Sequence, residues 1–150
     1  MPSTRIPDHL LQEELLDLNP TENKEIVRAF FEAGNRGDFD TCFAMIADDI
    51  TWTNIGATSL SGTFRGKADL MQNLLGPLFG QLEAGIRSEI VRLVAEGDYV
   101  VAQTSGTAST KDGREYNNRY CQVIRLRDGK FVEVTEYFDT HLTGTVFGFV

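Results

Sequence analysis

The sequence is poor in the residues that build metal centres and disulfide frameworks. It has two cysteines, Cys42 and Cys121, and two histidines in 150 residues, with no Cys-x-x-Cys or His-Glu-x-x-His motif. We therefore expect no metal site, and we predict that both thiols are reduced and buried among apolar neighbours. No apolar run approaches the ~20 residues that a membrane-spanning helix needs, so no membrane partner is expected.

Basic side chains are also scarce relative to acidic ones. Fourteen Lys and Arg against 22 Asp and Glu give a net charge of −8, and no local basic cluster interrupts this balance. Such a surface repels phosphate backbones, so we expect no nucleic-acid partner. The N-terminal segment has several acids and no apolar stretch ending in small residues, so it is unlike a secretion signal, and we expect a cytoplasmic location.

The first half of the chain has mainly helical periodicity. Apolar residues recur at helical spacing in residues 8–18, in residues 20–34, in residues 38–46, and in a segment that ends where Gly76-Pro77 interrupts it. The second helix is predicted to begin at Asn19-Pro20, because Asn is a good helix cap and Pro suits the first helical position. We predict a helical extension over residues 1–18 and a single domain over residues 19–150.

The second half of the chain is dominated by strand patterns. After a first strand at residues 50–54, four alternating runs cover residues 86–95, 99–109, 115–126 and 131–138. Short turns separate the four runs, and two of these turns contain Asp-Gly, which favours hairpins. Helices followed by an antiparallel meander predict an α+β fold with a strongly curved sheet and a concave ligand site.

Several segments, in this order and spacing, resemble the nuclear-transport-factor-two-like superfamily. They are residues 31–38 (FEAGNRGD), 47–52 (ADDITW), 62–67 (GTFRGK), 127–130 (RDGK) and 136–140 (EYFDT). The resemblance covers residues 20–142 and is closest to the SnoaL-like proteins, which are related to limonene epoxide hydrolases and ketosteroid isomerases. It implies a cystatin-like α+β roll, in which a cone-shaped antiparallel sheet wraps around the N-terminal helices. It also implies a homodimer formed through the sheet.

Compared with the related epoxide hydrolases, the matching positions have lost charge. The Asn of their Tyr-x-Asn motif is kept as Asn54, while the Tyr is Trp52. Glu136 stands at one Asp, and the Arg-x-Asp pair falls by ungapped register on Gln103 and Ser105. Two of the three charged members are missing, so an orthodox epoxide hydrolase is not expected.

The ketosteroid isomerase pattern is matched less well. The position of its Asp base corresponds to Asn54, and an amide does not accept the proton. The position of its helix Tyr corresponds to Phe30, and its protonated Asp donor falls near Tyr120 or Gln122. Because that mechanism needs a base and an oxyanion hole together, we do not expect it here.

Strand alternation and the family resemblance together define a candidate site: alternation groups side chains on a face, and the resemblance implies that the Asn118/Tyr120 face and the Glu136 face point inward. Asn118, Tyr120 and Gln122 share one face of their strand, and Glu136 and Phe138 share one face of the last strand. A carboxyl group in a half-dry cavity has a raised pKa, which suits Glu136 to acid/base catalysis, with Tyr120 beside it. The alternative is a structural Glu136 held by hydrogen bonds. The predicted substrate-binding residues are Trp52, Asn54, Asn118, Gln103, Ser105, Phe138 and Phe30.

Two main functions remain open at this point. The first is a cofactor-independent enzyme, of isomerase, cyclase, dehydratase (lyase) or hydrolase type, acting on a small apolar oxygenated molecule. The second is a non-catalytic ligand-binding or dimerisation module with the same pocket; a protein-partner adaptor ranks last. The apolar tail, residues 143–150, is expected either to close the pocket or to pack on a partner subunit.

Overall fold

A computed structural model describes the backbone of residues 8–150 and the side chains of residues 20–150. One curved sheet of six strands dominates the fold, in the order β2-β1-β6-β5-β4-β3. The strands are β1 (Ile46–Asn54), β2 (Gly62–Arg65), β3 (Arg87–Glu96), β4 (Tyr99–Thr107), β5 (Arg119–Arg127) and β6 (Lys130–Phe138). The predicted antiparallel meander is confirmed for β3 to β6. Because β1 runs parallel to β6, the complete sheet is mixed rather than antiparallel.

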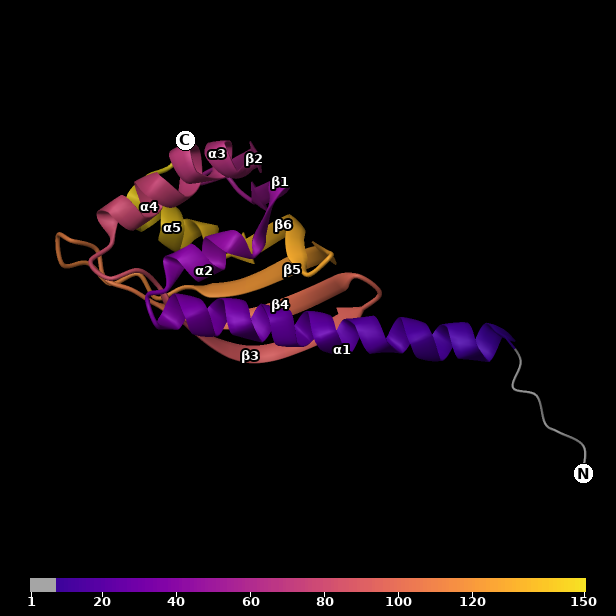
Figure 1. The fold of residues 1–150 in the computed structure, drawn as a ribbon. Coiled ribbons are helices and arrows are strands. Elements are labelled where there is room, and N and C mark those ends of the chain that lie inside the picture. Colours follow the sequence, from indigo (N-terminus) through magenta and orange to yellow (C-terminus); the bar gives the residue numbers. More distant parts are fainter. Residues whose placement is uncertain (1–7) are drawn as a thin grey trace, which may run out of the picture.

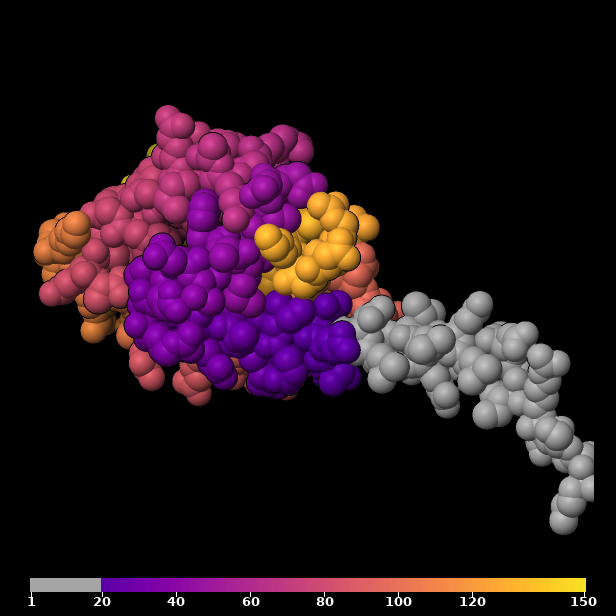
Figure 2. Space-filling view, in the orientation of Figure 1, coloured from indigo at the N-terminus to yellow at the C-terminus, as the bar shows by residue number. Residues whose placement is uncertain are grey.

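Helices cover the concave face of this sheet. The helical segments of the described chain are α1 (Asp8–Asn35), α2 (Phe39–Ala44), α3 (Lys67–Leu70), the π-helix η1 (Met71–Leu75), α4 (Gly76–Gln81) and α5 (Thr140–Phe147), of which α1, α2, η1 and α4 line the cavity over the concave face. Figure 1 shows α1 lying along β3 and β4, with which it is in contact. In the space-filling view of Figure 2, residues 20–85 hide most of the sheet behind them. None of the described helices is long and apolar enough to cross a membrane.

Several predicted boundaries are wrong in the helical half. Helix α1 is continuous from Asp8 and includes Pro20, so no new helix begins at Asn19-Pro20. Gly76-Pro77 does not end a helix but forms the first turn of α4, where Pro is tolerated. Strand β2 and helix α5 were not predicted at all. The division at residue 18 stays a prediction, and the amphipathic face expected of residues 8–18 lies outside the described side chains.

Turn chemistry explains the β5–β6 hairpin. Asp128 and Gly129 both have positive φ, 52° and 75°, as a two-residue turn between twisted strands requires.

Inside the sheet, one row across the strands is entirely apolar and forms the floor of the core. Val100, Ile124, Val134, Trp52 and Phe64 lie side by side in it, all buried. The hydrophobic pattern of the strands therefore fixes the inward face.

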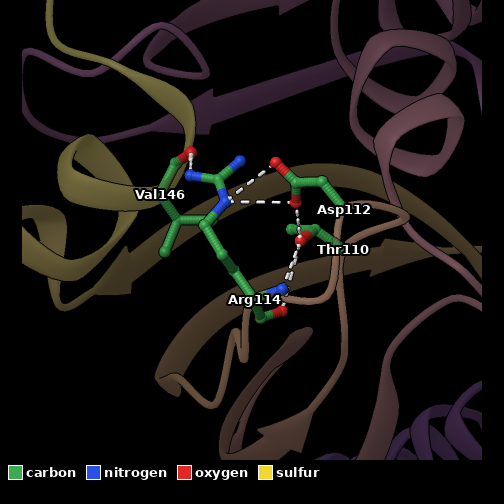
Figure 3. Close-up of polar contacts among 4 residues, drawn as sticks. All are labelled: Thr110, Asp112, Arg114 and Val146. Atoms are coloured by element: carbon green, nitrogen blue, oxygen red, sulfur yellow. Dashed lines mark hydrogen bonds and ion pairs between the residues drawn. The ribbon is translucent and has the colours of Figure 1, made fainter.

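The C-terminal segment packs on its own chain. Asp139 caps α5 by accepting a hydrogen bond from the Leu142 N–H, at 3.1 Å. At the other end of α5, Arg114 donates to the carbonyl of Val146 and is itself held by Asp112 through two bonds of 3.1 Å (Figure 3). A guanidinium suits this place, because the last carbonyls of a helix lack intrahelical donors and carry partial negative charge. No residue of the tail lines the cavity described below.

Candidate functional site

A cavity of about 380 Å³ lies between the concave face of the sheet and the helices, within the usual size range of ligand pockets. Its apolar wall comes mainly from α1, α2, η1 and α4, and its polar wall comes from β1, β4, β5 and β6. The side chains on the helical side include Phe30, Phe31, Phe39, Phe43, Met71, Leu74, Leu75, Leu78 and Phe79. The side chains on the sheet side include Trp52, Asn54, Thr104, Tyr120, Gln122 and Glu136.

Strand register sets the polar wall. Asn54, Glu136 and Gln122 are successive Cα partners on β1, β6 and β5, so they form one row across the sheet. Thr104 and Tyr120 are partners on β4 and β5, two residues further along. Because neighbouring strands lie ~4.8 Å apart, the register brings amide, carboxyl and hydroxyl groups together at one end of the cavity.

Glu136 is the one carboxyl group of the cavity wall in the described part of the chain. Burial raises its pKa to about 7, and the single opposing influence is a hydrogen bond from Gln122. The Gln122 Nε2 donates to Oε2 of Glu136 at 3.1 Å. Near neutral pH, both protonation states of this carboxyl group are therefore populated, which is the condition for a proton to be both donated and accepted.

Trp52 and Asn54 are held rigidly beside Glu136. The Trp52 Nε1 donates to Asn54 Oδ1 at 2.9 Å, and Asn54 Nδ2 donates to the Leu60 carbonyl at 3.0 Å. Both side chains are buried. The acceptor oxygen of Asn54 is thus engaged, and its amide retains one N–H that can face a ligand.

Tyr120 and Thr104 bring hydroxyl groups without partners. Within the described residues, neither the Tyr120 hydroxyl nor Thr104 Oγ1 makes a hydrogen bond, although both atoms are buried. Burial, followed by the neighbouring Tyr116 and Glu136, raises the pKa of Tyr120 far above its ordinary value, so it stays a neutral donor. A buried hydroxyl without a partner costs about 1–3 kcal/mol, which is a penalty that binding sites often carry.

This penalty is testable at Thr104. Replacing Thr104 by Val removes the orphaned hydroxyl at nearly constant shape, so we expect the free energy of unfolding to rise by about 1 kcal/mol. Urea denaturation measures the change, and Thr107→Val, at an exposed position of the same strand, is the control. A loss of stability in Thr104→Val would show that Oγ1 has a partner.

Comparison with known proteins places this geometry in a family. The model of the SnoaL-like domain matches residues 27–134, which is most of the chain. The chain belongs to the SnoaL-like family. The SnoaL-like domain is 28% identical over 115 residues to the epoxide hydrolase EphG of Mycobacterium tuberculosis, covering 77% of this chain and 72% of that protein.

Solved structures have the same architecture as this SnoaL-like domain. An NTF2-like protein from Burkholderia xenovorans is 31% identical with a TM-score of 0.67, covering 84% of this chain and 95% of that one. An LEH-like epoxide hydrolase of M. tuberculosis is 25% identical with a TM-score of 0.67, covering 84% of this chain and 89% of that one. An NTF2-like protein of unknown function from Burkholderia pseudomallei is 23% identical with a TM-score of 0.73, covering 82% and 95%. The predicted fold class and family resemblance are confirmed.

The SnoaL-like domain brings together five of the residues predicted for the site. Trp52, Asn54, Tyr120, Glu136 and Phe30 all line the cavity. Phe30, from α1, packs against Phe31 with ring centroids 5.5 Å apart and so forms part of the apolar wall. Their chemical roles remain proposals, but their proximity is a property of the structure.

Four predicted residues lie elsewhere. Gln103 and Ser105 lie on the opposite, convex face, because Thr104 points inward; the ungapped register assumed for this strand is off by one. Gln103 is exposed and accepts a hydrogen bond from Arg92. Asn118 is 1% exposed and bonded within the protein rather than to the cavity. Phe138 shares the inward face with Glu136 but is not among the cavity residues.

Sequence reasoning missed part of the site. The position of Thr104 in the cavity wall could have been predicted from the alternation of β4 with the correct register. Gln122 shares a strand face with Tyr120 in the sequence analysis but is not among the predicted site residues. The aromatic wall from α2 and α4, including Phe39, Phe43 and Phe79, had only weak signals, since both helices are short.

Both cysteines are free, as predicted, but half-buried rather than buried. Among the described residues, no group of His, Cys, Asp or Glu is arranged to hold a metal ion.

Proposed function

We propose that this domain is a cofactor-independent enzyme that performs acid/base chemistry on a small, largely apolar molecule bearing an oxygen atom. The observation that carries the proposal is Glu136, a carboxyl group with a pKa of about 7 at the polar end of an apolar cavity. A group that titrates near the working pH is effective in both directions of proton transfer, and such catalysis contributes ~10²–10⁴-fold in rate.

The chemistry follows from the two protonation states of Glu136. In the protonated state it donates its proton to the ligand oxygen. The carbon–oxygen bond of the protonated oxygen then breaks, and the oxygen leaves as water or, from a ring, becomes a hydroxyl group. The Glu136 carboxylate takes a proton either from the neighbouring carbon atom, leaving a carbon–carbon double bond, or from a water molecule that attacks the electron-poor carbon. The Tyr120 hydroxyl and the free N–H of Asn54 orient the oxygen, and the aromatic wall holds the apolar body.

Similarity to epoxide hydrolases supports a small-molecule substrate but does not define the reaction. In the described cavity wall there is one carboxyl group and no arginine, so no Asp–Arg–Asp set is present to activate water. Isomerisation, cyclisation and dehydration need a single acid/base group and fit this wall better than epoxide hydrolysis does.

A non-catalytic ligand-binding module is the second candidate. Asn54 is hydrogen-bonded to Trp52 and to the Leu60 carbonyl, and Glu136 is hydrogen-bonded to Gln122. These bonds favour the binding module, because they give the polar side chains a structural role that needs no catalysis. A homodimer through the convex face is compatible with either function. Large apolar side chains exposed on that face include Val94, Tyr99 and Tyr137.

Glu136→Gln separates the two candidates. Against a panel of apolar epoxides, cyclic enones and tertiary alcohols, we expect the wild type to turn over at least one class, and the variant to lose about 100-fold or more in kcat. Affinity for the same neutral ligand should change little, because an amide still donates a hydrogen bond. Glu133→Gln, on the same strand but exposed, is the matched control. Equal kcat in both variants would remove the catalytic role and leave the binding module.

A further inference from the structure

The cavity wall contains no positive charge and is rich in aromatic rings. Among its 22 lining residues, all within the described part of the chain, there is no Lys, Arg or His. Seven of the 22 are aromatic: Phe30, Phe31, Phe39, Phe43, Trp52, Phe79 and Tyr120. Aromatic faces attract cations, by about 0.5–2 kcal/mol each in favourable geometry. The Phe43 ring already carries the Lys67 Nζ, 4.6 Å from its centroid, so the other six rings are the ones open to a bound cation.

The ionisable groups that face the cavity are few. Besides Glu136 on β6, they are Tyr120 on β5 and Cys42 on α2. Burial raises the pKa of the Cys42 thiol and of the Tyr120 phenol, so both are neutral when Glu136 titrates. The lining residues from α1, β1, η1, α4, β3 and β4 are not ionisable. The charge of the cavity near neutral pH is therefore that of Glu136 alone.

The Glu136 carboxylate can also accept more hydrogen bonds than it does in this structure. Gln122 binds one oxygen, Oε2, and among the described residues no hydrogen bond reaches Oε1. No cation lies close enough to lower the pKa of this group, since its only favourable influence is the Gln122 amide. A carboxylate in this environment has a desolvation cost that an adjacent positive charge offsets.

We propose that the cavity binds small alicyclic or branched ammonium ions, with the Glu136 carboxylate as counter-ion and the aromatic rings around the alkyl groups. This inference rests on the proposed function. When Glu136 protonates a ligand oxygen, a positive ligand faces a carboxylate, and an ammonium ion reproduces that pair of charges permanently. Ammonium ions are therefore expected to inhibit whatever turnover the enzyme has.

Three probes that share one ring test the charge preference: N,N-dimethylcyclohexylammonium, cyclohexyl methyl ketone and cyclohexanecarboxylate. In calorimetric titrations at about pH 8, we expect the ammonium ion to bind about tenfold more tightly than the ketone, and the carboxylate not to bind. At about pH 5, Glu136 is protonated, and the preference for the ammonium ion over the ketone should fall to the smaller part that the aromatic rings supply.

Variants test whether the preference for the ammonium ion comes from Glu136. Glu136→Gln should bind the ketone as the wild type does but lose most of the tenfold preference for the ammonium ion, whereas Glu133→Gln should keep it. If ammonium ion and ketone bind equally at about pH 8, or if the preference is as large in Glu136→Gln as in the wild type, this inference is wrong while the proposed function stands. If the wild type binds none of the three probes, the cavity is not a site for small molecules and the proposed function fails as well.

Discussion

Asn118→Ala is expected to lower the free energy of unfolding by about 3–5 kcal/mol, because it removes the hydrogen-bond partner of several buried and part-buried groups at once. Asn118 is 1% exposed. Its Oδ1 accepts the backbone N–H of Arg119 at 2.8 Å and that of Asp139 at 3.0 Å. Alanine leaves both N–H groups without their partner, at a cost of about 1–3 kcal/mol each.

The amide nitrogen of Asn118 adds to this loss. Its Nδ2 donates to the Asp139 carbonyl and to Thr143 Oγ1, both at 3.1 Å, and to the Tyr116 hydroxyl at 3.2 Å. One side chain thus joins the start of β5, the end of β6 and helix α5. Because a domain is stabilised by only about 5–15 kcal/mol in total, the variant is expected to be marginal at 37 °C.

Urea denaturation at 25 °C measures the effect of Asn118→Ala. Gln103→Ala is the matched control, since Gln103 is exposed on the convex face and its removal should change stability by less than about 0.5 kcal/mol. A change below about 1 kcal/mol for Asn118→Ala would show that the network does not carry the junction.

The four strands of the meander, β3 to β6, could be predicted from the sequence because their signals are local. Asp128-Gly129 between two alternating runs is sufficient for a hairpin, since few other residues accept two positive φ values. Helix α5 could not be predicted in this way. Its residues, Thr140–Phe147, include Gly144 and two further threonines, which are weak helix formers, and the helix is held by the remote Arg114 and by packing. Tertiary contacts here override local propensity.

The site was predictable where alternation and the family resemblance agree, and not where the register of a strand decides. Alternation groups Tyr120 with Gln122 and Glu136 with Val134, and the resemblance implies that these faces point inward. Gln103 and Ser105 were misplaced because their assignment came from an ungapped comparison, and a shift of one residue turns every side chain to the other face. Asn118 has the correct parity, but its place at the junction with α5 depends on a helix that the sequence did not reveal.

Glu136→Gln is expected to remove a pH dependence of stability worth about 3 kcal/mol. The carboxyl group of Glu136 has an ordinary pKa of 4.5, which burial raises to about 7 in the folded protein. Between these values the unfolded chain has lost a proton that the folded protein still holds. The contribution of Glu136 is therefore fully present below about pH 4.5, falls as the pH rises, and is lost above about pH 7.

The measurement is the free energy of unfolding in urea at steps from about pH 4.5 to about pH 8, for wild type and variant together. The advantage of Glu136→Gln over the wild type should grow by about 3 kcal/mol across this range, because 2.5 pH units of displaced titration correspond to that free energy. Other groups titrate equally in both proteins and cancel in the difference, and Glu133→Gln should follow the wild type. Parallel curves for wild type and Glu136→Gln would mean that the carboxyl group titrates normally and is not poised for proton transfer. A growing advantage would show that the domain retains a destabilising acid in its cavity wall, which is the pattern expected where function rather than stability maintains a residue.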